Sequence, residues 1–453
     1  MSAVLAIQQR RQRGGRGAVL TLADQLLSSA SNFVLGVLIA RAGGADALGT
    51  FGIAFLVWLA VMGANRALVA EPMTVTGSTD DSGAQLGEGL SATLVMGVVV
   101  AAALALVAGA LLLLGVPTVA LLALAPWIPS LLAQEYFRLM AFRMQRPLQA
   151  LISDLVFAVT QAAAIVVLYV FDELSVAAFL AAWGMGATLG AVAGFAMCGV
   201  VANACRGGAA HLRGLWNRSR WFLAEFGMSF VSGQGYLLLL PILLSTAEFG
   251  LYRAGASLIG PVIVLFRAGT GVGLPECVRQ LRRDGISGLT FYAPRLTAVV
   301  VLLAVAYCGT LALLAAPVLR LTYGAAFTEA AVITQLVAIA YVIAACSLGY
   351  GVALKAAEQL KALWSLRALS ATVSIIAMVV LVNAFGLVGA GWAGIGTAST
   401  YAGGVLIMYR RMCKRQSIGT SGQPNHHHQH FTRGARGDDP VDGTTRSGER
   451  GIS

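Results

Sequence analysis

Long apolar runs separated by short polar breaks follow one another along nearly the whole sequence. Each run is close to the roughly 20 residues that a helix needs to cross a bilayer. In lipid, a chain satisfies its backbone hydrogen bonds only in helices or closed barrels, and continuous apolar runs of this length favour helices. We therefore predict an all-α polytopic membrane protein with about twelve transmembrane helices, at residues 17–40, 48–70, 89–114, 118–137, 150–170, 176–202, 222–245, 254–274, 293–316, 329–350, 366–385 and 391–409.

The composition agrees with this prediction. Only 11% of the residues are charged and 58% are hydrophobic, and the mean hydropathy is +0.78. A soluble domain has about 25% charged residues. The breaks between the runs are short, and they leave no room for the large loop or appended domain on which a membrane glycan polymerase or ligase usually displays its catalytic groups. The sequence therefore favours a transporter over an integral-membrane enzyme.

Basic residues are divided unevenly between the two sets of loops. With a cytoplasmic N-terminus, the inner segments contain twenty-one lysines and arginines, and the outer loops contain three, Arg41, Arg253 and Arg320. Cytoplasmic loops are enriched in these residues, so both termini are predicted to face the cytoplasm of a multi-pass protein of the bacterial inner membrane. The net charge of +11 is then an orientation signal and not the footprint of a nucleic-acid partner.

The segment 22–67 recurs 201 positions later without a gap. Nine positions are identical, where so biased a composition would give roughly four by chance. Asp24 falls on Glu225, and Phe51 falls on Tyr252. The identical residues of the first copy are Leu22, Ala23, Ser28, Ser31, Leu38, Gly49, Val61, Arg66 and Ala67.

A second pattern recurs farther along the chain. Residues 141–153 and 353–365 both read Ala, apolar, base, four residues, Leu, any, Ala, Leu, any, Ser. Because the order of elements is unchanged, we predict two parallel six-helix lobes. The expected domains are a basic cytoplasmic N-terminus (1–16), an N-lobe (17–203), a basic cytoplasmic linker (204–221), a C-lobe (222–409) and a disordered cytoplasmic tail (410–453).

Histidines and cysteines give no indication of a metal or a cofactor. The histidines of the tail, at 426–428 and 430, have no second ligand cluster in the sequence. The six cysteines occur singly, without metal-ligand or redox spacing, and are expected to be free, inert thiols.

Two repeated pairs of opposite charge lie inside the predicted helices. Asp24 is about 10 Å into the first helix, and Arg66 is about 6 Å from the inner end of the second, at ~1.5 Å per residue. They could pair, and the same holds for Glu225 and Arg267. One interpretation is a structural ion pair in each half. The other is functional, with Arg66 and Arg267 approaching a central cleft from opposite lobes to bind phosphate bidentately, while Asp24 and Glu225 orient them or carry a coupling proton.

Other polar residues extend this hypothetical site. Asn65 and Gln234 are candidate neutral donors for sugar hydroxyls, although polar residues in a bundle more often bond a neighbouring helix. Arg143 and Lys355, the bases of the second repeat, are predicted on the cytoplasmic rim. They serve there as orientation signals and could also gather anionic lipid headgroups at the entrance.

Several segments carry a family resemblance. The segments 17–41 (GAVLTLADQLLSSASNFVLGVLIAR), 47–51 (ALGTF) and 249–255 (FGLYRAG) resemble polysaccharide (O-antigen-type) flippases of the multidrug, oligosaccharidyl-lipid and polysaccharide exporter superfamily. The segment 135–143 (EYFRLMAFR), with Asp154 downstream, is similar to that family's connection between the fourth and fifth helices. The resemblance covers nearly the whole chain up to residue 415.

The resemblance implies two lobes that rock around a central cavity. The head group of a polyprenyl-diphosphate-linked glycan would cross through the cavity while its lipid tail stays in the bilayer. Bilayer lipids and glycan-assembly proteins are the expected partners. Twelve helices fit polysaccharide flippases, whereas peptidoglycan-precursor flippases typically have two more. Drug-extruding relatives usually have acidic cation sites in the N-terminal lobe. Asp24 is the candidate for such a site here, so an ion-coupled multidrug exporter is the alternative.

Overall fold

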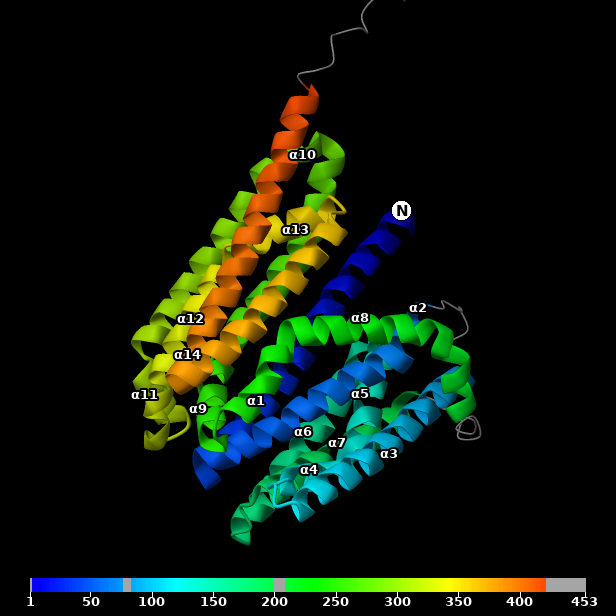
Figure 1. Ribbon diagram of the computed structural model, residues 1–453. Helices are drawn as coiled ribbons and strands as arrows, with labels where there is room; N and C mark the ends of the chain where they lie inside the picture. The colour runs from blue at the N-terminus through cyan, green and yellow to red at the C-terminus, as the bar shows by residue number, and fades with distance from the viewer. Residues whose placement is uncertain (1, 76–82, 199–207, 421–453) are drawn as a thin grey trace, which may run out of the picture.

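The computed structural model describes residues 2–75, 83–198 and 208–420, and all regular structure within them is helical (Figure 1). The first half contains α1 (Ser2–Asn65), a π-helical segment η1 (Arg66–Ala70), α2 (Glu71–Val75), α3 (Gly83–Leu113), α4 (Val119–Leu124), η2 (Ala125–Trp127), α5 (Ile128–Arg143), α6 (Pro147–Val170) and α7 (Val176–Cys198). The second half contains α8 (Gly208–Leu243), α9 (Thr246–Ser257), α10 (Gly260–Leu313), α11 (Ala315–Thr322), η4 (Ala325–Ala330), α12 (Ala331–Ala345), α13 (Leu348–Ala356) and α14 (Leu360–Thr420).

The chain is a multi-pass membrane protein, as the sequence predicts. Within the described residues, eight helices are long and apolar enough to cross a membrane. A ninth span is formed if the two parts of α8, bent by 53°, are taken together. The count of twelve stays a prediction, because three of the long helices each cover two of the predicted spans.

Single glycines turn these long helices back on themselves. A straight helix of 64 residues, the length of α1, would measure about 96 Å, roughly three times the bilayer core. α1, α10 and α14 instead contain Gly44, Gly285 and Gly386, with φ of 72°, 64° and 58°. All three lie in breaks between predicted spans. Glycine adopts this conformation without the steric cost that a Cβ imposes.

The helix α8 joins the two halves. Near its start, the Ser219 hydroxyl donates to the Leu68 carbonyl (2.8 Å), and the Gly208 N–H donates to the Ser91 hydroxyl (3.1 Å). Its end packs among the helices of the C-lobe, so α8 crosses from one lobe to the other (Figure 1). The described part of the predicted linker, residues 208–221, is therefore helix packed on the N-lobe.

Helix also extends into both predicted terminal segments. α1 begins at Ser2, and α14 continues to Thr420, so the start of the predicted tail is helical. The four tail histidines and Cys205 lie outside the described residues. The five described cysteines are free, and three of them, Cys198, Cys277 and Cys308, are buried.

The two copies of the first repeat meet in a crossing of α1 and α9, at residues 45–52 and 246–253. A methyl group added to Gly49 would overlap the Thr246 carbonyl oxygen, and one added to Gly250 would overlap the Ala45 carbonyl oxygen. These positions exchange under the offset of 201, so the contact is a pseudo-twofold one. Only glycine permits such a close approach of two backbones. The identity of Gly49 and Gly250 thus has a packing cause.

Two arginines hold the lobes together near this crossing. Arg253 Nη1 donates to the Gly52 carbonyl (3.3 Å), and its guanidinium lies 5.2 Å from the centroid of the Phe55 ring. Arg41 Nε donates to the Thr322 carbonyl (2.7 Å), at the end of α11. We call residues 45–52 and 246–253 together with these arginine contacts the lobe crossing.

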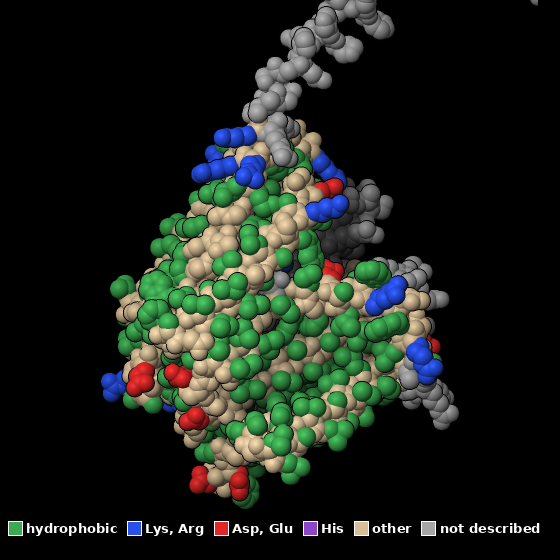
Figure 2. All heavy atoms as spheres, in the orientation of Figure 1, with side chains coloured by type: hydrophobic (Ala, Val, Ile, Leu, Met, Phe, Trp, Pro, Cys, Tyr) green, Lys and Arg blue, Asp and Glu red, His purple; other side chains and the backbone are tan. Residues whose placement is uncertain are grey.

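Charged side chains gather at two opposite ends of the molecule. Figure 2 shows lysines and arginines at the end where α10 turns and α14 projects and also at the right, where α8 lies, while most acidic side chains lie at the lower end, where α9, α11 and α4 lie. Between the two ends the surface is largely hydrophobic. The lobe crossing is at the acidic end.

Candidate functional site

Five charged side chains form a cluster inside the N-lobe. Arg138 on α5 is its centre: Nε lies 3.0 Å from Asp24 Oδ2 and 3.4 Å from Asp154 Oδ2, and Nη1 lies 3.2 Å from Glu135 Oε2. Arg66 pairs with the other oxygen of Glu135. We call Asp24, Arg66, Glu135, Arg138 and Asp154 the N-lobe charge cluster.

The N-lobe charge cluster is largely buried and unbalanced in charge. The side chain of Asp24 is 0% exposed and that of Arg138 is 12% exposed, whereas that of Arg66 is 36% exposed. Three carboxyl groups face two guanidinium groups, which leaves one excess negative charge when all are ionised. Asp24 Oδ1 is buried without a hydrogen-bond partner. A buried polar atom without a partner is costly in free energy, so Asp24 Oδ1 is the atom of the cluster at which a further hydrogen bond would be most favourable.

The ion pairs differ from those that the repeat predicts. Asp24 pairs with Arg138 and not with Arg66, and Arg66 pairs with Glu135. Among the ion pairs of the described residues, none joins Glu225 to Arg267. The second half has no counterpart of Arg138, since the offset of the second repeat, 212, places Tyr350 at that position. The symmetric pairing was therefore wrong.

A cavity of 430 Å³, which we call the N-lobe cavity, lies beside the charge cluster. Arg66 and Arg143 both line it, together with Glu71 and Phe142. From the sequence, Arg66 was predicted at the central phosphate site and Arg143 on the cytoplasmic rim. They border the same space.

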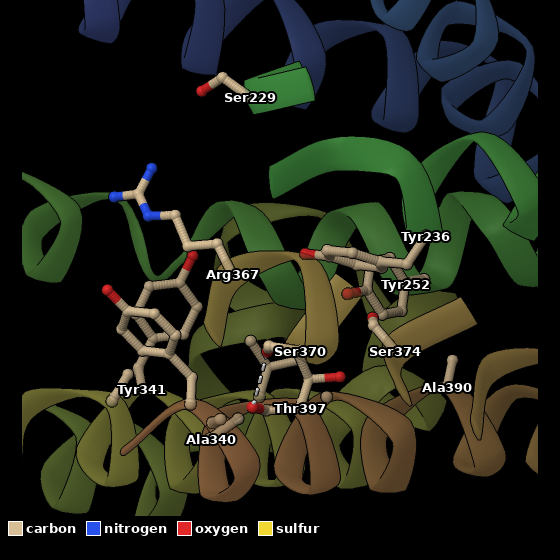
Figure 3. Close-up of a pocket in the computed structure, with 15 residues that line it drawn as sticks. Ser229, Tyr236, Tyr252, Ala340, Tyr341, Arg367, Ser370, Ser374, Ala390 and Thr397 are labelled. Carbon is tan, nitrogen blue, oxygen red and sulfur yellow. Dashed lines mark hydrogen bonds between the residues drawn. The ribbon is translucent and has the colours of Figure 1, made fainter. Parts of the chain in front are cut away.

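A second cavity of 430 Å³ lies inside the C-lobe, between α8, α9, α12 and α14. Tyrosines and small hydroxyl residues provide most of its polar surface, and Arg367 is the one charged residue of its described lining. Figure 3 shows Tyr341 on one side, Tyr236 and Tyr252 on the other, and Arg367 reaching toward Ser229. Ser370 Oγ is 3.4 Å from the Thr397 carbonyl oxygen. We call this space the C-lobe cavity.

Arg367 borders two pockets of the C-lobe, the C-lobe cavity and a small pocket of 50 Å³ that Glu225 and Trp364 also line. The charge of Lys355 acts on Arg367, and Glu71 of the N-lobe lies close enough to Glu225 and Arg66 for their charges to interact. Glu71 lines the N-lobe cavity and Glu225 lines the small pocket, and we call the surroundings of these two pockets, with Arg66, Arg143 and Arg367, the entrance region.

Two other predicted site residues, Arg267 and Asn65, do not line the cavities described above. Arg267 is an exposed residue of α10. Asn65 is 2% exposed, and its Oδ1 is buried without a hydrogen-bond partner. Gln234 lies in α8, but its side chain is outside the described ones. No group of three or more His, Cys, Asp or Glu side chains within the described part of the chain is arranged to hold a metal ion.

Sequence reasoning overlooked Arg138, Glu135, Asp154 and Arg367 as site residues. Glu135 and Asp154 lie inside predicted spans, where an ionisable residue is by itself a functional signal. That signal was available, but the choice of residues followed the repeat. Arg367 was counted only as a cytoplasmic base, because it lies at the start of a predicted span.

Comparisons with known proteins identify the fold. No family model and no curated protein matches the sequence. Among solved structures, the lipid II flippase MurJ in an inward closed conformation is similar with a TM-score of 0.64, 12% identity, and coverage of 90% of this chain and 94% of that chain. The inward-facing conformation of a multidrug resistance MATE family transporter of the MOP superfamily gives 0.66, 11% identity, and coverage of 90% and 100%. The chain has the fold of the MOP superfamily transporters.

The conformation also has a counterpart among these MOP structures. An outward-facing conformation of a multidrug resistance MATE family transporter gives a TM-score of 0.55, with 11% identity and coverage of 89% and 96%. The inward-facing conformation gives 0.66. By this measure the whole chain is more similar to the inward-facing structure than to the outward-facing one.

Proposed function

We propose that this protein moves a polyprenyl-diphosphate-linked glycan from the inner to the outer leaflet of a bacterial inner membrane, by alternating access of two lobes. The observation that carries the proposal is the set of bases at the entrance region. Arg66 and Arg143 line the N-lobe cavity, while Arg367 lines the C-lobe cavity, next to Lys355. Guanidinium groups bind phosphate oxygens bidentately and stay charged in apolar surroundings.

The orientation of the molecule supports loading from the cytoplasm. By the positive-inside rule, the basic end is the cytoplasmic one, and the acidic end with the lobe crossing faces outward. Contacts of Arg41 and Arg253 close the lobes at that outer end. The entrance region then opens toward the leaflet in which lipid-linked precursors are made. The broad hydrophobic surface of the lobes would leave the polyprenyl tail in the bilayer.

A deletion experiment tests the proposal. Without the protein, a surface glycan should disappear while its lipid-linked precursor accumulates on the cytoplasmic side, and the wild-type gene should restore it. Arg367→Ala should restore it poorly, whereas Arg411→Ala, which changes an exposed base of the same helix α14, should restore it fully. Normal surface glycans and no precursor accumulation in the deletion strain would contradict the function.

A specific observation also favours an ion-coupled exporter as the second candidate. The N-lobe charge cluster carries one excess negative charge and an unpartnered Asp24 Oδ1, as a proton-coupled carrier requires. Asp24→Asn removes that charge while keeping the side-chain shape. We expect transport by this variant to lose its dependence on pH, measured with purified protein in vesicles at fixed membrane potential. An unchanged pH profile would leave the cluster a purely structural one.

The substrate separates the two candidates. An exporter of cationic drugs should lower the drug susceptibility of cells that produce it, and its loss should leave lipid-linked precursors unchanged. An integral-membrane enzyme would act in detergent, where no two compartments exist, whereas flipping needs both. Glycan-assembly partners and the role predicted for Arg267 stay predictions.

A further inference from the structure

The C-lobe cavity has the properties of a built binding site. Its volume of 430 Å³ falls within the roughly 300–1,000 Å³ of small-molecule sites. Ser374 is 5% exposed and lines the cavity, and its hydroxyl has no hydrogen-bond partner among the described residues. The oxygen is accessible from the cavity, so a water or a ligand in the cavity can satisfy this hydroxyl.

The tyrosines of the cavity combine flat apolar faces with hydroxyl groups. The Tyr341 ring is held by the Phe266 ring of α10, with centroids 6.0 Å apart and an interplanar angle of 37°. Tyr236 and Tyr252 lie on the opposite side of the cavity (Figure 3). A pyranose ring has apolar C–H faces and a rim of hydroxyls, so it matches such a space. Tyrosine and serine hydroxyls can both donate and accept.

The charge at the mouth excludes one class of occupant and favours another. Arg367 is the one charged residue of the described lining, and a lipophilic cation would be repelled by it. In the described part of the chain, Arg367 has no ion-pair partner. Glu225 shares the small pocket with Arg367, but it does not line the C-lobe cavity, whose described lining carries one positive charge and no negative one.

We propose that the C-lobe cavity binds the first sugar ring of a diphosphate-linked glycan, with Arg367 at its mouth binding the phosphate. This inference rests on the proposed function and adds to it the place of each part of the head group. The sugar lies among Tyr341, Tyr252 and Ser374, and the diphosphate lies between the C-lobe cavity and the arginines of the N-lobe. The linkage to the lipid then points toward the bilayer.

The test measures binding to the purified full-length protein in detergent by thermophoresis. The probes are farnesyl diphosphate, the same lipid carrying N-acetylglucosamine or galactose, and the soluble sugar nucleotide UDP-N-acetylglucosamine. We expect wild-type protein to bind at least one sugar-bearing lipid about 5- to 10-fold more tightly than the bare lipid, as one or two added hydrogen bonds would give. The sugar nucleotide should bind more weakly than the sugar-bearing lipid.

The variants separate the sugar from the phosphate. Ser374→Leu fills the cavity and Tyr341→Phe removes one hydroxyl, so both should reduce the preference for the sugar and leave binding of the bare lipid unchanged. Arg367→Ala should weaken binding of all the diphosphates about tenfold or more. Ser365→Leu and Arg411→Ala, at exposed positions of α14 outside the cavity, are the matched controls and should bind as wild type does. The melting temperature of each variant shows whether it is folded. If Ser374→Leu does not fold, Tyr341→Phe alone tests the preference for the sugar.

Each other outcome overturns the inference in a recognisable way. If wild-type protein binds none of the lipid diphosphates, the proposed function fails and the inference fails with it. If it binds them without preference for a sugar, or if the cavity variants bind as wild type does, the inference fails while the proposed function stands. Equal affinity for the soluble sugar nucleotide would show that the cavity takes a soluble ligand and not a lipid-linked one.

Discussion

At the scale of single residues, Arg138 has the most partners among the buried charges. Its guanidinium faces three carboxyl groups from three helices, Asp24 of α1, Glu135 of α5 and Asp154 of α6. Gln134 Nε2 donates to the second oxygen of Asp154 (2.7 Å), and Ser31 Oγ donates to Gln161 Oε1 (2.8 Å) nearby on the same helices. One guanidinium thus links α1, α5 and α6 of the N-lobe.

Arg138→Ala should therefore destabilise the protein strongly. The change leaves buried carboxyl groups without a partner, for which losses of about 3–5 kcal/mol in the free energy of unfolding are typical. Arg66→Ala should cost less, because the Arg66 side chain is 36% exposed. Arg279→Ala is the control: its pair with Glu276 is exposed and contributes about 0–1 kcal/mol. Thermal unfolding in one detergent checks the order, and equal melting temperatures for the Arg138 and Arg279 variants would contradict it.

The sequence could predict which residues of this cluster are unusual but not how they pair. Asp24 and Arg66 are conspicuous as charges within apolar runs, and both belong to the cluster. Their partners come from α5 and α6, more than 60 positions away, and long-range contacts of this kind leave no periodic pattern. The repeat suggested the same ion pair in both halves. The carboxyl groups that complete the cluster, Glu135 of α5 and Asp154 of α6, occur only in the first half. The C-lobe uses its equivalent space for a cavity with Arg367.

At the scale of elements, the sequence predicted the helices well because the bilayer requires them. Runs of apolar residues long enough to cross lipid have few alternatives to helix. The ends of the helices were predicted less well. The break around Gly386 contains a single residue with a non-helical conformation and no run of polar residues that would signal a loop, so the two helices follow each other directly. The start of α8 was predicted to be a linker because its basic residues interrupt the apolar pattern, although this segment is helical and packs on the N-lobe.

The crossing of α1 and α9 leads to a prediction for a repeated glycine. Gly250→Ala places a methyl group on the Ala45 carbonyl oxygen and should force the two helices apart, at a cost of about 1–3 kcal/mol. Gly309→Ala in α10 meets nothing within 4 Å and should be neutral or slightly stabilising, since alanine favours helix. The comparison uses melting temperatures of the two purified variants. A Gly250 variant as stable as the Gly309 variant would mean that the close approach is easily relaxed.

At the scale of the whole molecule, the lobes share few fixed points. α8 joins them covalently, and at the acidic end the contacts of Arg41 and Arg253 hold them together. Both arginines donate to backbone carbonyls of the other lobe rather than to carboxylates. A hydrogen bond between neutral groups typically stabilises a fold by about 0.5–1.5 kcal/mol, and one with a charged donor such as arginine by about 1.5–3 kcal/mol. Under the proposed function, these arginine contacts would break in each transport cycle, together with the packing of the lobe crossing.

Locking this closure should therefore stop transport while leaving binding intact. In a cysteine-free background, Arg41→Cys with Thr322→Cys places one thiol on each lobe at the closed end, and a short bifunctional methanethiosulfonate would join them. The joined protein should bind a lipid diphosphate as the unjoined one does, but it should not move it across vesicles until a reductant cleaves the link. Arg41→Cys alone, treated in the same way, controls for the loss of the arginine and should transport at its own unmodified rate. Transport by the joined protein at that rate would show that the two lobes need not separate at this end, and the alternating-access mechanism would then be wrong.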